Sequence, residues 1–73
     1  MFFNKNLKYL RKKERNLSQD ALAEVLGISR SALVSYESGR AEPRLLVLIQ
    51  IAHYFNISIE ELVNRDLDGY RKQ

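Results

Sequence analysis

Four side chains near the middle of the chain form a row that is suited to binding a partner rather than to catalysis. They are spaced as neighbours on one side of a helix: Arg30, Ser31, Val34 and Ser35. The row combines a cation, two short hydroxyl groups and one small apolar group. The same segment carries Ile28, Leu33 and Tyr36 on its other side, which we expect to be buried. A helix that is packed at its back and has short side chains on its front can be laid against another surface.

The other reactive residue types do not form a catalytic or metal-binding set. His53 is the single histidine, it has no second ligand one helical turn away, and the chain has no cysteine. We interpret His53 as a structural residue of an apolar helix. The serines have no histidine at a relay position, and Glu60 and Glu61 are explained by helix capping. We therefore expect no enzyme, no metal, no cofactor and no small-molecule ligand.

Helical periodicity dominates the chain, so we expect an all-α fold, a compact bundle of five short helices. The expected helices cover residues 4–14, 19–26, 29–37, 44–55 and 59–64. Asn4, Ser18, Ser29 and Ser58 are expected to cap four of them at the N-terminus. Gly27 is expected to end the second helix in the left-handed conformation.

The second helix must support the row from behind, and we expect it to bury Leu22, Ala23, Val25 and Leu26. The helix at 44–55 is apolar on nearly all sides, which is typical of a helix at the centre of a core. Residues 1–64 are expected to form one domain. Residues 65–73 have little to pack, and we expect a frayed tail there.

Length and charge narrow the class of protein. A chain of 73 residues makes one small domain, and a net charge of +3 permits a polyanionic partner without requiring one. Cations gather in the first 16 residues, which a solvated helix face would explain equally well. No stretch suits a signal peptide or a membrane span. We therefore expect a cytoplasmic protein with no membrane contact.

The segment from residue 19 to residue 38 resembles the helix-turn-helix of the Cro/repressor-type family, also called XRE-like. The matches fall at a small residue of the first helix, at the turn and at the buried positions of the second helix: Leu22-Ala23, Leu26-Gly27-Ile28, Leu33 and Tyr36. The flanks agree as well: Leu17-Ser18-Gln19 before the motif, and Tyr36-Glu37-Ser38-Gly39-Arg40 with Pro43 after it. The resemblance covers nearly all of residues 3–64.

The resemblance implies a lambda-repressor-like fold whose third helix, about residues 29–37, enters the major groove of DNA. The positions that contact bases in the family are matched by Arg30, Ser31 and Ser35, and Val34 could touch a thymine methyl group. The positions that hold phosphates are matched by Gln19, Ser38, Arg40 and Arg44. Gln19 could instead be an ordinary helix-start residue, and Arg40 and Arg44 could be solvated loop cations.

One departure from the family concerns an arginine at the end of the first helix. In much of the family it stands seven residues before the motif's glutamine and pairs with the glutamate that ends the third helix, here Glu37. Lys12 has that spacing, whereas Arg11 is one residue further back, so the connector looks one residue longer. We favour Arg11 as the partner of Glu37 because its guanidinium is forked.

The function that the resemblance implies is sequence-specific binding of double-stranded DNA by a transcriptional regulator, which we expect to be a repressor. We expect a two-fold dimer on a palindromic operator. The expected dimer contact involves the fourth and fifth helices: Ile57, Ile59, Leu62 and Val63, which could also all be core. The alternative is an antitoxin or another protein-interaction module that keeps the fold. The chain could also be the DNA-binding part of a longer regulator.

Overall fold

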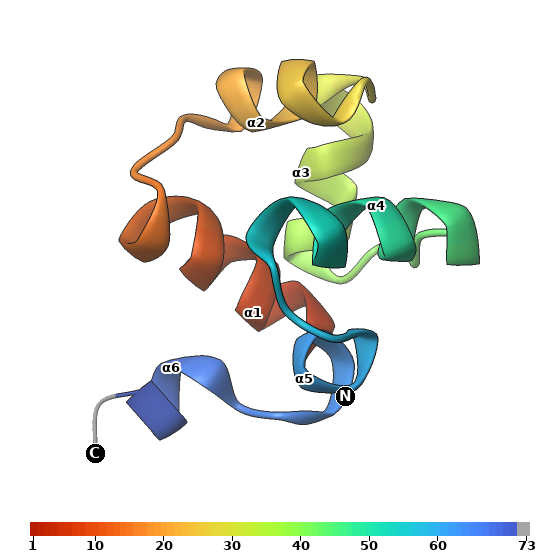
Figure 1. Cartoon of the computed structure of the whole chain (residues 1–73). Coiled ribbons are helices and arrows are strands. Elements are labelled where there is room, and N and C mark those ends of the chain that lie inside the picture. Colours follow the sequence, from red (N-terminus) through yellow and green to blue (C-terminus); the bar gives the residue numbers. More distant parts are fainter. Residues whose placement is uncertain (72–73) are drawn as a thin grey trace.

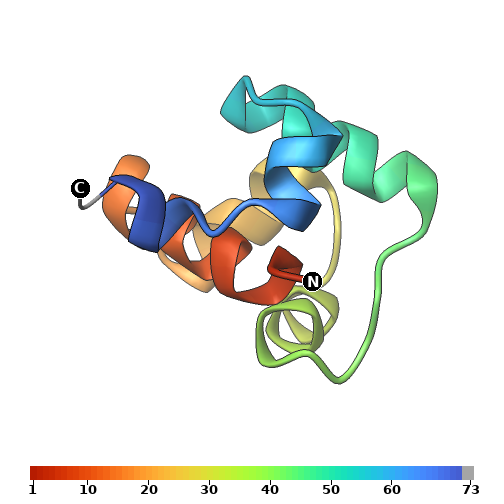
Figure 2. The same cartoon turned by 90° about the horizontal axis from the view of Figure 1, so that it is seen from below.

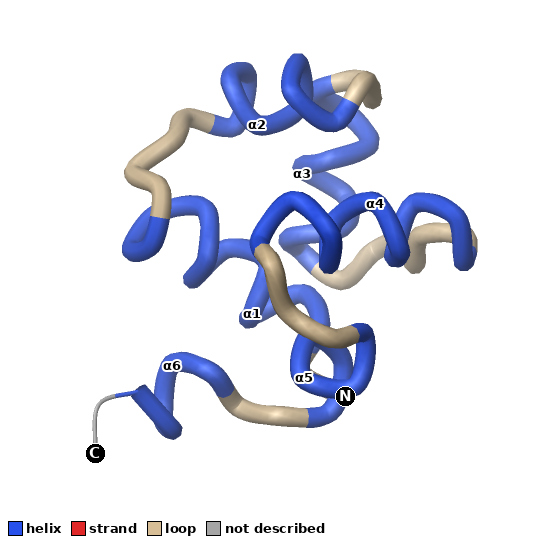
Figure 3. The backbone as a smooth tube through the Cα atoms, in the orientation of Figure 1, coloured by secondary structure: helices blue, strands red, loops and turns tan. Residues whose placement is uncertain are grey.

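The computed structural model describes residues 1–71, and this part of the chain is all-helical, as predicted (Figures 1 and 3). The described elements follow in this order: α1 (Phe3–Tyr9), a π-helical turn η1 (Leu10–Glu14), α2 (Gln19–Leu26), α3 (Arg30–Ser38), α4 (Leu45–Phe55), α5 (Ile59–Asn64) and α6 (Leu67–Arg71). α1 and η1 together take the place of the first predicted helix, and α6 is additional. Crossing a membrane would need a longer apolar helix than any that residues 1–71 contain.

The three serine caps are confirmed. The side chains of Ser18, Ser29 and Ser58 each accept a hydrogen bond, 3.0 Å long, from the backbone N–H three residues later: Ala21, Ala32 and Glu61. Gly27 ends α2 at a φ of 69°, where a side chain would be strained. The caps fix where α2 and α3 begin, and the glycine fixes the turn between them.

The predicted cap at Asn4 is wrong. Phe2 takes the N-cap position of α1, and no side chain bonds there. The Phe2 N–H instead donates to the carbonyl of Val63 at 2.8 Å. A backbone bond to α5 therefore holds the start of α1, and Asn4 lies within the helix.

The helix widens directly after α1. In η1 the N–H of Arg15 donates to the carbonyl of Leu10, five residues earlier, at 3.2 Å. Asn16 follows at a φ of 52°, which asparagine tolerates better than most residues. A π-helical turn holds one more residue than an α-helical turn. η1 thus lies at the point where the resemblance predicted a connector one residue longer.

The core forms around α1, which packs against α3, α5 and α6 (Figure 2). The largest fully buried apolar side chains come from all six α-helices of residues 1–71 and from η1: Leu7, Leu10, Leu22, Leu33, Ile51, Leu62 and Leu67. The predicted inner positions Ala23 and Leu26 are buried too. Val25 is not, because 52% of it is exposed on the outer side of α2.

α4 is not the central helix that its composition predicted. Its second half is buried through Ile51, Ala52 and Phe55, but Leu45 and Leu46 are 64% and 74% exposed and Ile49 is 43% exposed. In Figure 1 the N-terminal end of α4 projects past α3. We call these three exposed side chains, Leu45, Leu46 and Ile49, the α4 patch. A helix that is apolar on every side gives no sequence signal for the side that faces the core.

The expected frayed tail is also wrong for residues 67–71, which form α6. Asn6 of α1 is fully buried, and its amide donates to the carbonyls of Leu62 at 2.8 Å and Arg65 at 2.6 Å. Its amide oxygen accepts from the N–H of Leu67 at 3.0 Å. Leu67 is 2% exposed, so α6 has an apolar anchor. Residues 72 and 73 of the expected tail lie outside the described residues.

Candidate nucleic-acid interface

The row predicted from the sequence lies on the first two turns of α3. Arg30 and Ser31 are exposed, and Val34 and Ser35 are half-buried. The other side of α3 is held by Leu33, which is fully buried. α3 therefore offers a narrow polar front, open at its N-terminal end, on a packed back.

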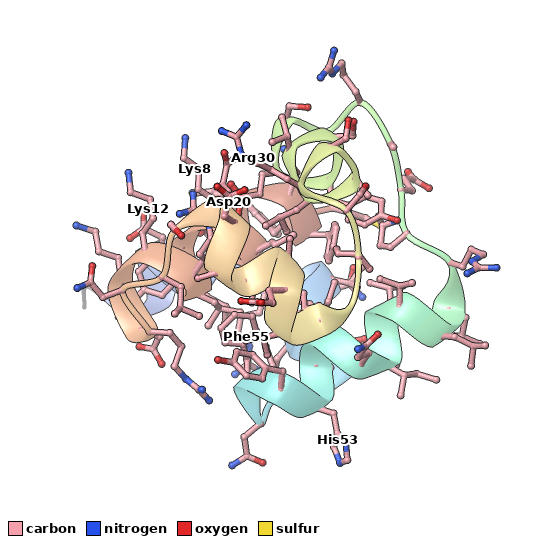
Figure 4. The ribbon with its side chains drawn as sticks, turned by 90° about the horizontal axis from the view of Figure 1, so that it is seen from above. Lys8, Lys12, Asp20, Arg30, His53 and Phe55 are labelled. Carbon is pink, nitrogen blue, oxygen red and sulfur yellow. The ribbon has the colours of Figure 1, made fainter. Side chains whose placement is uncertain are left out.

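The N-terminal ends of α2 and α3 meet through an exposed ion pair (Figure 4). Nε of Arg30 lies 3.2 Å from Oδ1 of Asp20, and the two side chains are 63% and 78% exposed. Asp20 is the second residue of α2, and Arg30 is the first of α3. The cation of the row thus has an acidic neighbour on the preceding helix.

A second ion pair lies behind α3, between Arg11 and Glu37, and it confirms Arg11 over Lys12 as the partner. Nε of Arg11 lies 2.6 Å from Oε2 of Glu37, and Nη2 lies 3.0 Å from Oε1. The third nitrogen, Nη1, donates to the carbonyl of Leu17 at 2.8 Å. The forked contact satisfies both buried charges and ties η1 to α3.

Gln19, predicted to contact phosphate, is half-buried and turned toward this pair. Its Nε2 donates to Oε1 of Glu37 at 3.1 Å. The amide group has a second N–H to donate. Gln19 therefore joins the first residue of α2 to the last turn of α3, and one of its donors is already used.

The other three residues predicted to contact phosphate lie at or after the end of α3. The hydroxyl of Ser38 donates to the carbonyl of Ser35 at 3.2 Å, and Gly39 follows at a φ of 83°. Arg40 and Arg44 are exposed, and Arg44 holds the N-cap position of α4. The loop between α3 and α4 thus carries one exposed cation near each end.

Several cations of the first 16 residues already contact other parts of the fold. Besides Arg11, Lys5 lies 3.0 Å from Oδ1 of Asp66. Arg15 donates to the carbonyl of Tyr54 at 2.9 Å, and its guanidinium carbon lies 4.6 Å from the centre of the Tyr54 ring. Composition alone therefore overstates the positive charge that this end of the chain offers a partner.

His53 does not pack in the core, because its side chain is exposed on α4 (Figure 4).

The residues expected at a dimer contact are too buried to offer much surface to a second copy. Leu62 is fully buried, and Ile57, Ile59 and Val63 are half-buried against the core. Leu62 is therefore a core residue.

Sequence reasoning gave Asp20 no role. Its signal is weak, because an aspartate in the first turn of a helix is explained by the helix dipole alone. Only the turn at Gly27 brings it to Arg30, ten residues later. The serine caps fix where both helices start, but the distance between the two charges also depends on the angle between α2 and α3.

Comparison with known proteins identifies the arrangement. The helix-turn-helix family model matches residues 7–62. The transcriptional activator BcrR of Enterococcus faecalis is 41% identical over 64 residues, which are 88% of this chain and 31% of that protein. An uncharacterised HTH-type regulator of Methanocaldococcus jannaschii is 39% identical over 56 residues, 77% of this chain and 83% of that protein.

A further relative is the antitoxin PezA of Streptococcus pneumoniae, which is 37% identical over 62 residues, 85% of this chain and 39% of PezA. The chain thus spans less than half of BcrR and PezA, but most of the M. jannaschii regulator. No solved structure matches the chain significantly.

Proposed function

Because the chain belongs to the helix-turn-helix family of DNA-binding transcriptional regulators, of the XRE-like type, we propose that it binds double-stranded DNA sequence-specifically through α3. The observation that carries this proposal is the polar front of α3 on a packed back. The major groove is wide enough for an α-helix and displays a different donor and acceptor pattern for each base pair. We place the protein in the cytoplasm, with the DNA that it binds.

Arg30 is the residue that we assign to base recognition first. Its guanidinium can donate two hydrogen bonds to O6 and N7 of a guanine. Ser31 and Ser35 can donate to or accept from base edges, directly or through water. Val34 and Ser35 are half-buried, so they reach bases only if α3 lies deep in the groove.

Phosphate contacts are assigned to Gln19, Ser38, Arg40 and Arg44. These residues position the protein on DNA without reading its sequence. Gln19 would give its second amide N–H to a phosphate while the first stays on Glu37. Its orientation would then be set before DNA arrives.

We further propose that two copies bind a palindromic operator. The longest extent of the molecule is 33 Å and half-sites one helical turn apart are separated by ~34 Å, so two copies whose long axes follow the DNA would touch. We assign their contact to the more exposed α4 patch. Leu62 is fully buried, and Ile57, Ile59 and Val63 are half-buried against the core. The patch offers a few hundred Å² at most, well below the ~800 Å² per partner of a stable interface. We therefore expect the dimer to form on the operator.

Repression is the regulatory output that we propose. A bound dimer represses by occupying the operator, which needs no surface beyond those described above. Activation would need a further contact with the transcription machinery.

Selection of bound sites from a random duplex library tests the proposal. An enriched palindrome would support both sequence-specific binding and the dimer. On the selected site, Arg30→Ala should reduce affinity mainly where guanine stands at the matching position, whereas Arg44→Ala should weaken all sequences alike and lower the salt slope by about 1. Identical behaviour of the two variants on selected and random DNA would refute base reading by α3.

The dimer contact is tested separately with Leu46→Gln. It should reduce affinity for the palindrome about tenfold and leave affinity for a single half-site unchanged, because the lost contact is between copies. Val25→Gln is the matched control, since Val25 is also exposed but lies on α2. Equal losses on the half-site and the palindrome would rule out the α4 patch as the contact.

The similarity to PezA favours one second candidate, a module whose main task is to bind a partner protein. Duplex binding that falls steeply with salt would argue against it. Indifference to DNA over the same salt range would favour it.

A further inference from the structure

The Asp20–Arg30 pair joins two positions that the backbone already fixes. Ser18 caps the start of α2, and Ser29 caps the start of α3. Asp20 stands two residues after the first cap and Arg30 one residue after the second. The two side chains therefore extend from fixed backbone positions, and their charged groups lie within ion-pair distance.

The contact uses one edge of the guanidinium. Oδ1 of Asp20 lies 3.2 Å from Nε, the nitrogen nearest the backbone. The two terminal nitrogens together carry four further N–H groups. A carboxylate on Nε thus orients the arginine and leaves the end of the fork for a guanine edge.

We propose that Asp20 is a positioning residue for DNA recognition, which holds Arg30 in the orientation that reads guanine. The inference rests on the proposed role of Arg30 as a base reader. A free arginine has many rotamers, and orienting it before binding reduces the entropy lost when it docks.

The negative charge of Asp20 has a separate effect, on affinity. Binding to unrelated DNA depends almost wholly on phosphate attraction. An exposed carboxylate beside the recognition helix weakens that attraction on every sequence, whereas the orientation of Arg30 helps only where guanine is present. The charge therefore lowers affinity for all sequences alike, and the orientation of Arg30 is what increases the preference for the correct site over other DNA.

The test compares Asp20→Asn with Glu24→Gln. Glu24 is also an exposed acid of α2, one turn further on, and no ion pair is seen for it within residues 1–71. Each variant removes one negative charge. Affinities are measured on the selected operator and on a duplex in which the guanine facing Arg30 is replaced, and circular dichroism checks that each variant is folded.

Both variants should bind both duplexes more tightly through charge alone. Asp20→Asn should also lower discrimination between the duplexes about two- to fivefold, the range expected for an exposed ion pair. Glu24→Gln should leave discrimination unchanged. In an Arg30→Ala background, Asp20→Asn should no longer affect discrimination.

Two results would overturn the inference, and they differ in what else they remove. If Arg30→Ala lowers discrimination but Asp20→Asn and Glu24→Gln behave alike, Asp20 does not position Arg30, and the role of Arg30 stands. If Arg30→Ala leaves discrimination unchanged, the proposed base reader fails and the role of Asp20 fails with it.

Discussion

Two arginine–carboxylate pairs hold α3 in opposite ways. The Arg11–Glu37 pair lies behind the helix, with side chains 9% and 4% exposed and a closest distance of 2.6 Å. The Arg30–Asp20 pair lies at its front, with side chains 63% and 78% exposed and a distance of 3.2 Å. The same chemistry gives a fixed link where water is excluded and a breakable one where it is not. Burial therefore separates the charges that hold the fold from those available to DNA.

The largest expected effect comes from breaking the buried pair. Arg11→Ala should lower the free energy of unfolding by about 3–5 kcal/mol, because Glu37 would keep a buried charge with only Gln19 as its partner. Urea denaturation followed by circular dichroism measures this. Lys12→Ala, at the exposed neighbour, should stay within about 0.5 kcal/mol of the parent chain. A loss below about 1 kcal/mol for Arg11→Ala would contradict the structural role of the pair.

An intermediate effect is expected at the front, and on recognition instead of stability. Arg30→Ala should change the free energy of unfolding by less than about 1 kcal/mol. It should reduce discrimination for guanine at the matching position by about 1–3 kcal/mol. Denaturation and duplex titration on the same preparation separate the two quantities. A variant that unfolds as easily as Arg11→Ala would show that Arg30 belongs to the fold.

The smallest expected effect is the salt dependence of stability. Asp20→Asn should lower the free energy of unfolding by at most about 1 kcal/mol at low salt, through the lost ion pair and the lost charge at the start of α2. Near 1 M salt this difference should vanish, because exposed charges are screened. The loss caused by Arg11→Ala should persist there. Equal salt sensitivity of the two losses would mean that burial does not separate the pairs.

The sequence predicted those parts of the fold that depend on local signals. Serine caps, the turn at Gly27 and the packed back of α3 are set by residues a few positions apart. The choice of Arg11 over Lys12 also followed from one side chain's geometry. Long-range contacts were missed. Asn6 acts on α5 and α6 about 60 residues away, so no local pattern reveals that it orders residues 67–71.

In the candidate site, too, the features set by local signals were predicted and those set by long-range contacts were missed. The row on α3 was predictable from periodicity, because one side of the helix must face the core. Its acidic neighbour Asp20 was not, since the contact depends on the angle between α2 and α3. The inward turn of Gln19 was missed for the same reason. The projection of α4 had no sequence signal, because every side of that helix is apolar.

The wide turn η1 has a consequence for how chains of this kind should be aligned. One residue inserted into a regular α-helix would rotate everything after it by about 100°. Here the helix widens for one turn, so Arg11 still faces Glu37 and Leu17 still packs against the core. An alignment that forbids gaps inside helices would place Lys12 opposite the family's arginine. A one-residue gap within residues 12–16 keeps the true partners in register.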